Sequence, residues 1–196
     1  MIRADLSGYR EGIEGVATRP FKNRNIYSLL IAMGMEKDDP LIGKPAPAFC
    51  LPDADNTRIC LEQFRQKWVV LYFYPRDNTP GCTIEAMQFN ASLEQFASLG
   101  AQVIGVSKDP PASHRAFAEK HNLSVLLLSD VDHTVLEAYG AWKPVNIFGK
   151  EVLGTGRDTV LIDPAGMIVA VWRKVNPKGH AAEVREVLMD RMKGGA

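Results

Sequence analysis

The residue best placed to carry out chemistry is Cys82, in the segment Thr79-Pro80-Gly81-Cys82. The apolar run 68–74 before it predicts a strand buried on both faces, and the spacing of apolar residues after it predicts a helix. A cysteine at the start of a helix lies near unpaired backbone N–H groups and the positive end of the helix dipole. Both favour the thiolate, which is the nucleophilic form of the side chain. Cys82 is therefore a candidate redox or nucleophilic centre.

The elements that must position this cysteine alternate between strands and helices from residue 47 onward. An N-terminal β-hairpin is predicted from two short strands, 48–51 and 57–61, around turn-forming residues. The other expected strands are 68–74, 101–106, 125–129, 159–162 and 167–172, and the expected helices are 82–99, 111–121, 134–139 and 181–193. This order predicts an α/β protein, a three-layer sandwich with a central mixed β-sheet.

Composition and charge exclude several classes of partner. Lys plus Arg equals Asp plus Glu at 23 each, so the net charge gives no reason to expect nucleic acid or an anionic membrane as partner. Three cysteines in 196 residues do not make a disulfide framework, and we expect a reduced, cytoplasmic protein. The four histidines show no metal-ligand spacing, so we expect them at the surface or at helix caps, with no metal and no cofactor.

The first 40 residues are interpreted as an N-terminal extension, followed by one domain over 41–196. Basic residues precede the apolar stretch 26–35, as in an export signal, but charged residues follow it where a cleavage site would need small ones. The stretch is also too short to span a bilayer. Two interpretations stay open: an extra segment that packs on the domain, or a true start at Met33 or Met35.

The segment from Pro75 to Ala86 resembles the active-site motif of peroxiredoxins, specifically the bacterioferritin comigratory protein or Q-type group of AhpC/TSA-like proteins. It matches Pro-x-x-x-Thr-x-x-Cys and its Q-type continuation. Further matches lie at 45–53, at Arg157 and at 172–180, so the resemblance covers about residues 41–193. It implies a thioredoxin-like fold and thiol-dependent reduction of hydrogen peroxide and organic hydroperoxides.

The resemblance assigns roles to four catalytic residues. Cys82 would attack one peroxide oxygen and become a sulfenic acid. Arg157 would stabilise the thiolate and the negative charge that develops along the O–O bond. The Thr79 hydroxyl would accept a hydrogen bond from the peroxide and contact the sulfur, and Pro75 would keep water from the thiolate.

Four further residues would support this site. Glu85 lies one turn along the same helix and by resemblance would orient the arginine, although an acid in the first turn stabilises any helix. Pro80 would restrict the backbone, and Gly81 would leave backbone N–H groups free to donate. Tyr74 would form part of the pocket wall.

The sequence departs from the group at the resolving cysteine. The usual position, five residues after Cys82, holds Met87, which we expect to fill the core, and the helix 111–121 contains no cysteine. The simplest hypothesis is a one-cysteine mechanism, in which thioredoxin, glutaredoxin or a low-molecular-weight thiol resolves the sulfenic acid. Cys50 and Cys60 are expected to be structural thiols; the alternatives are that one of them resolves Cys82, or that they pair across the hairpin.

A second class of function also stays open. Without a resolving cysteine, a long-lived sulfenic acid at Cys82 would suit a peroxide-sensing redox relay or interaction module with little turnover. The set of Thr79, Cys82 and Arg157 favours an enzyme, a thioredoxin-dependent peroxiredoxin. By resemblance we expect a monomer or a weak dimer.

Overall fold

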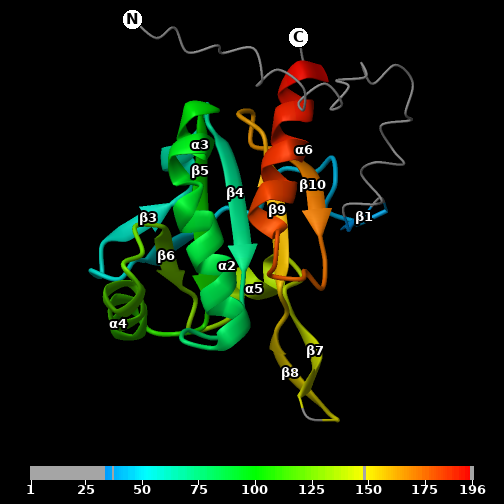
Figure 1. The fold of residues 1–196 in the computed structure, drawn as a ribbon. Helices are drawn as coiled ribbons and strands as arrows, with labels where there is room; N and C mark the ends of the chain where they lie inside the picture. The colour runs from blue at the N-terminus through cyan, green and yellow to red at the C-terminus, as the bar shows by residue number, and fades with distance from the viewer. Residues whose placement is uncertain (1–33, 37, 148, 195–196) are drawn as a thin grey trace, which may run out of the picture.

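The computed structural model describes residues 34–36, 38–147 and 149–194, and its centre is a six-stranded sheet in the order β1-β10-β9-β4-β5-β6 (Figure 1). The strands are β1 (Met35–Glu36), β4 (Trp68–Phe73), β5 (Ala101–Ser107), β6 (Leu126–Ser129), β9 (Asp158–Ile162) and β10 (Ile168–Trp172). Strands β4, β5 and β6 run parallel, whereas β9 is antiparallel to β4 and β10 is antiparallel to β9. The predicted mixed sheet is confirmed.

The central strand β4 is apolar because both of its faces are covered. Residues 69–73 are at most 2% exposed. Tyr72 pairs with Gly105 of β5 on one side and with Thr159 of β9 on the other. A side chain at Gly105 would place its Cβ 2.5 Å from the Tyr72 ring, so a glycine lets this ring pack flat against the neighbouring strand.

The helices form the outer layers on the two faces of this sheet. They are α2 (Pro80–Ala91), α3 (Leu93–Ser98), α4 (Pro111–His121), α5 (Thr134–Ala138) and α6 (His180–Gly194). One core takes Phe89, Phe117 and Val187 from α2, α4 and α6. The other takes Leu136 of α5 and Phe49 beside the first hairpin. Figure 1 shows α2 and α6 in front of the sheet, in agreement with the predicted three layers.

Two hairpins lie outside the central sheet. The predicted N-terminal hairpin is confirmed as β2 (Cys50–Pro52) and β3 (Arg58–Cys60), followed by the short helix η1 (Leu61–Phe64). The second, β7 (Trp142–Ile147) with β8 (Lys150–Thr155), was not predicted. β8 is largely exposed, and β7 is at most half-buried and carries a proline, Pro144, so neither strand has the apolar pattern of a packed strand.

Two boundaries differ from expectation. The helix expected over 82–99 is broken at Ser92, where α2 ends and α3 begins, and Asn90 and Ser92 are both weak helix formers. Within the expected extension 1–40, Met35 and Glu36 form β1 and pair with Val171 and Trp172 of β10. Most of the apolar stretch 26–35 lies outside the described residues. In the described part of the chain, no helix is long and apolar enough to cross a membrane.

Candidate active site

Cys82 is the third residue of α2, at the point where β4 has passed through a short loop into the helix. Thr79 is the N-cap residue and Pro80 is the first helical residue, a position where a missing N–H costs no helical hydrogen bond. All three cysteines lie in the described part of the chain, and Cys82 is the free one, only 1% exposed. The local sequence therefore places the thiol at the helix start, as predicted.

Arg157 reaches this thiol from a distant part of the chain. It directly precedes β9, and because β9 runs antiparallel beside β4, the start of β9 lies next to the end of β4. The Nη2 atom of Arg157 donates to Cys82 Sγ at 3.3 Å, and its Nη1 atom donates to Glu85 Oε2. The fold thus brings together three residues that the sequence analysis expected to act together.

Burial and charge act on this cluster in opposite directions. Burial raises the pKa of Glu85, and the Arg157 guanidinium opposes that rise. Burial also works against the charge on Arg157, but the Glu85 carboxylate and the Cys82 sulfur outweigh it and raise the pKa of Arg157 above its ordinary value. The guanidinium therefore stays charged beside the sulfur at any pH at which the protein is folded.

Gly81 leaves room for the close approach of the guanidinium. A Cβ at this position would lie 3.0 Å from Arg157 Nη2. This space is a second reason for the glycine, beyond the backbone N–H groups that the sequence analysis considered.

Thr79 lines a groove beside the site, together with Arg157 but without Cys82 itself. Its hydroxyl donates to the carbonyl oxygen of Arg76 at 3.0 Å, which leaves the lone pairs of the hydroxyl oxygen available as acceptors. The groove has a volume of about 790 Å³. Its lining includes Pro75, Thr79, Lys108 and Arg157 on one side and Val145, Asn146, Leu153 and Gly154 of the β7–β8 hairpin on the other.

Tyr74 does not line this groove. It is 1% exposed, and its hydroxyl donates to Asp77 Oδ1 at 2.8 Å. Burial, followed by the charge of Asp77, raises the pKa of Tyr74 well above its ordinary value. Its hydroxyl also lies 3.3 Å from His114 Nδ1, so Tyr74 contacts both the loop that leads to Cys82 and α4.

A buried network around Asp77, which the sequence analysis missed, holds this loop against α4. Asp77 Oδ2 accepts from the Ser113 hydroxyl at 2.7 Å and lies 2.9 Å from His114 Nδ1. The Asp77 N–H donates to Asp109 Oδ2 at 2.8 Å. Burial alone would raise the pKa of Asp77, but the bonds from His114, Ser113 and Tyr74 together lower it. The spacing of Ser113 and His114 on the helix was the available signal, since their neighbour Phe117 was expected on the buried side.

Several expectations about single residues are wrong. His114 is 0% exposed and lies inside α4, neither at the surface nor at a cap, and His180, the first residue of α6, is only 1% exposed. Met87, expected in the core, is 50% exposed. Position 87 lies on the solvent side of α2, whereas Cys82, Glu85, Ala86 and Phe89 are buried. Helical spacing located the buried face only approximately.

Cys50 and Cys60 form a disulfide, so the expectation of two unpaired structural thiols is wrong, and the alternative that they pair across the hairpin is confirmed. They are directly opposite each other in the β2–β3 register, with their Cα atoms 4.0 Å apart. The residues on either side of Cys50, Phe49 and Leu51, pack into the core on the α5 face of the sheet, while Cys82 belongs to the other core. The sheet separates the disulfide from Cys82.

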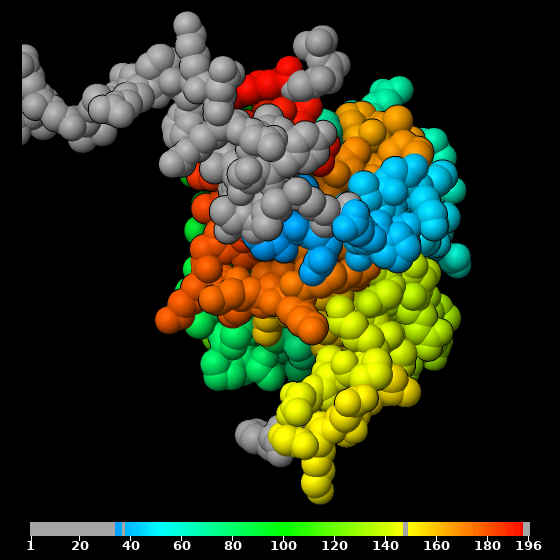
Figure 2. Space-filling view, turned by 90° about the vertical axis from the view of Figure 1, so that its right-hand side faces the viewer, coloured from blue at the N-terminus to red at the C-terminus, as the bar shows by residue number. Residues whose placement is uncertain are grey.

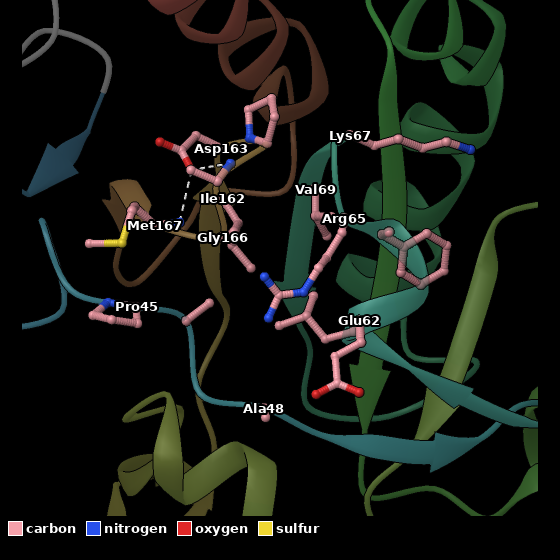
Figure 3. A pocket seen from close by; sticks show the side chains of 15 residues that line it. Pro45, Ala48, Glu62, Arg65, Lys67, Val69, Ile162, Asp163, Gly166 and Met167 are labelled. Carbon is pink, nitrogen blue, oxygen red and sulfur yellow. Dashed lines mark hydrogen bonds between the residues drawn. The ribbon is translucent and has the colours of Figure 1, made fainter.

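A second hollow lies at the other end of the sheet from Cys82 (Figure 3). It has a volume of about 290 Å³ and apolar walls that include Ala48, Val69 and Ile162. It contains none of the cysteines and none of the predicted catalytic residues. No group of His, Cys, Asp and Glu side chains in the ranges that the structure describes is arranged to hold a metal ion.

Known proteins resemble this chain over the region that contains the site. The AhpC/TSA family model matches residues 42–171. Peroxiredoxin Bcp of Bacillus subtilis is 47% identical over 149 residues, which are 76% of this chain and 95% of that protein. Peroxiredoxin Bcp of Xanthomonas campestris is 41% identical over 152 residues, 76% of this chain and 95% of that protein.

The structural comparison agrees. A solved structure of the Xanthomonas campestris bacterioferritin comigratory protein, from work on its alkyl peroxide reduction activity, superimposes with a TM-score of 0.69 at 40% identity. The match covers 73% of this chain and 91% of that chain. These relatives support a thiol peroxidase function and a thioredoxin-like fold. The chain belongs to the AhpC/TSA family and, within it, to the Bcp/PrxQ peroxiredoxins.

Proposed function

We propose that the protein reduces hydrogen peroxide and organic hydroperoxides with Cys82 as the peroxidatic nucleophile, and that an external thiol completes each cycle. The observation that carries this proposal is the contact of Arg157 Nη2 with Cys82 Sγ at 3.3 Å. A fixed cation beside the sulfur favours the thiolate and, in a site with little water, stabilises negative charge that develops during reaction.

The first half-reaction converts the thiolate into a sulfenic acid. The Cys82 sulfur attacks the terminal oxygen of the hydroperoxide, and a new S–O bond forms as the O–O bond breaks. The departing oxygen takes up a proton and leaves as water or an alcohol. Arg157 would stabilise the charge on the two oxygens, and the lone pairs of the Thr79 hydroxyl would accept the hydrogen bond of the peroxide O–H.

The supporting residues keep this arrangement in place. Glu85 would hold the guanidinium at the sulfur through the Arg157 Nη1 hydrogen bond. Pro75 and Thr79 would form the floor of the groove beside the thiol. Pro80 would rigidify the first turn of α2 and Gly81 would leave room for the arginine. Tyr74 would act through the loop rather than touch the peroxide.

The second half-reaction needs a reductant from outside the chain. Cys50 and Cys60 are bonded to each other, and the sheet lies between them and Cys82. A thiol of thioredoxin, glutaredoxin or a small molecule would attack the Cys82 sulfur and release water, forming a mixed disulfide. A second thiol would then release the Cys82 thiol, so that each hydroperoxide consumes two thiols.

The test is peroxide consumption by the wild-type protein and by Cys82→Ser, with thioredoxin plus its reductase and then with glutathione. We expect turnover by the wild type with at least one reductant and none above background by the variant. Equal consumption by both proteins would contradict the proposal. A wild type that consumes only one equivalent of peroxide with every reductant would favour the sensing alternative.

A trapping experiment tests the one-cysteine mechanism separately. After one equivalent of peroxide, mass spectrometry should find a sulfenic acid on Cys82 that dimedone labels, and no new intramolecular disulfide. A bond between Cys82 and Cys50 or Cys60 would show that one of these residues resolves it and would remove the need for an external resolving thiol.

A further inference from the structure

The β7–β8 hairpin supplies none of the residues proposed to act on the peroxide, yet it forms one wall of the groove beside the site. It projects from the body of the protein (Figures 1 and 2). Val145 of β7 and Leu153 of β8 both line the groove that Thr79 and Arg157 line. Leu153 is 64% exposed, so this wall presents apolar surface to solvent in the groove that Thr79 and Arg157 also line.

A buried carboxylate at the start of β9 fixes the base of the hairpin. Lys143 of β7 forms an ion pair with Asp158, which directly follows Arg157 and is 0% exposed. Asp158 also accepts from Arg173 Nη1 at 3.0 Å and from the Lys174 N–H at 3.1 Å. The hairpin and the catalytic arginine are therefore attached to one short stretch of chain.

The path of Lys143 depends on a glycine. A Cβ at Gly156 would lie 2.4 Å from Lys143 Cε, so any larger residue there would displace the lysine stem. The Gly156 N–H donates to the Ala141 carbonyl at 2.8 Å, which closes the base of the hairpin. Gly156 lies between β8 and Arg157, so both attachments are made within a few residues of the site.

We propose that Lys143 is a positioning residue that holds the β7–β8 hairpin over the groove and so determines how well the protein distinguishes a bulky hydroperoxide from hydrogen peroxide. This inference rests on the proposed function. Hydrogen peroxide fills only the end of the groove at Thr79 and Arg157 and has no contact with the hairpin. An apolar organic hydroperoxide extends toward Val145 and Leu153, where contact removes apolar surface from water.

The ion pair can be removed without leaving a buried charge unpaired. Without the ammonium of Lys143, Asp158 keeps Arg173 and the Lys174 N–H as partners. Trp142, the first residue of β7, still stacks on His133 with ring centroids 3.9 Å apart. The β7–β8 pairing should therefore remain formed, while the hairpin loses the ion pair that orients it over the groove.

The experiment compares kcat/KM for cumene hydroperoxide with kcat/KM for hydrogen peroxide in the wild type and in Lys143→Met. The methionine keeps most of the stem of the lysine and removes its charge. We expect the ratio of the two values to fall about tenfold, chiefly through a higher KM for cumene hydroperoxide. The matched control is Lys150→Met, at the exposed far end of the same hairpin, which should leave the ratio within about twofold of the wild type.

A second variant keeps the test decisive if Lys143→Met gives little folded protein. Leu153→Ser changes an exposed side chain and should lower the same ratio about fivefold, since it removes apolar surface from the groove wall. A ratio that stays at the wild-type value in the folded variants, or equal losses for both peroxides, would overturn the inference. A wild type that reduces neither peroxide would instead overturn the proposed function.

Discussion

The two regions of the molecule that contain cysteine differ in burial, partner and charge. Cys82 is buried, free and in contact with a guanidinium. Cys50 is exposed and bonded to Cys60, directly across a two-stranded hairpin. In the sequence, Cys50 and Cys60 show only an alternation with apolar neighbours. The same side chain is thus poised for nucleophilic attack in one place and used as a cross-link in the other.

The difference lies in what tertiary structure supplies to each sulfur. At Cys82 it supplies a helix start, an arginine 75 positions further along the chain and an acid that holds this arginine. At Cys50 it supplies a second thiol, that of Cys60 on the adjacent strand, at bonding distance. A thiolate with a cation and no thiol partner reacts with an external oxidant, whereas a thiol that faces another thiol is consumed by pairing.

Removal of the cation should have the largest effect and should separate the two regions sharply. We expect Arg157→Gln to slow the oxidation of Cys82 by hydrogen peroxide by about 100-fold or more, because the group that stabilises the developing charge is lost. The rate constant can be measured by rapid quenching and mass spectrometry of the sulfenic acid. Arg191→Gln, on the exposed end of α6, is the matched control. An undiminished rate in Arg157→Gln would show that the guanidinium is not what makes Cys82 reactive.

Removal of the disulfide should affect stability rather than rate. The double variant Cys50→Ser/Cys60→Ser loses a cross-link that closes a loop of about ten residues, which corresponds to about 3 kcal/mol of unfolding free energy. Urea denaturation gives this value. The oxidation rate of Cys82 should stay within about twofold of the wild type. A large loss of peroxidase activity in the folded double variant would mean that the β2–β3 hairpin takes part in the catalytic cycle.

A methyl group at the helix start should have a smaller effect, on rate rather than on stability. Gly81→Ala would place a Cβ 3.0 Å from Arg157 Nη2 and displace the guanidinium from the sulfur. We expect the oxidation of Cys82 to slow by about tenfold, a cost of about 1.4 kcal/mol. Alanine is the better helix former, so thermal unfolding should not occur earlier. An unchanged oxidation rate would show that the guanidinium keeps its contact with the Cys82 sulfur despite the added methyl group.

The smallest expected effect is the pH dependence of the loop that holds Cys82. The pKa of Asp77 is lowered in the folded protein, so its carboxylate stabilises the fold at pH values above the unfolded pKa of about 3.9. This contribution is lost as the pH falls through the folded pKa. The difference in unfolding free energy between wild type and Asp77→Asn should therefore shrink on acidification, by on the order of 1 kcal/mol. A difference that is constant from pH 7 to pH 3 would contradict this assignment.

Much of the fold could be predicted because its signals are local. The run that forms β4 is apolar at every position, and turn residues mark the β2–β3 and β9–β10 connections. The β7–β8 hairpin was missed because it packs little and carries no apolar alternation. The break at Ser92 was missed because the apolar spacing continues through it. Burial of His114 and exposure of Met87 both depend on which helix face meets the sheet, and periodicity alone does not fix that face.

The sequence by itself determined that a cysteine begins a helix after a buried strand, since residues 68–83 contain the strand, the N-cap and the proline needed for this arrangement. Resemblance to the family pointed to Arg157, but only the pairing of β9 with β4 brings its guanidinium to the sulfur. Only the register of β2 and β3 decides that Cys50 and Cys60 bond to each other. The physical reason is range: helix starts and turns depend on neighbouring residues, whereas a cation or a thiol partner must come from another part of the chain.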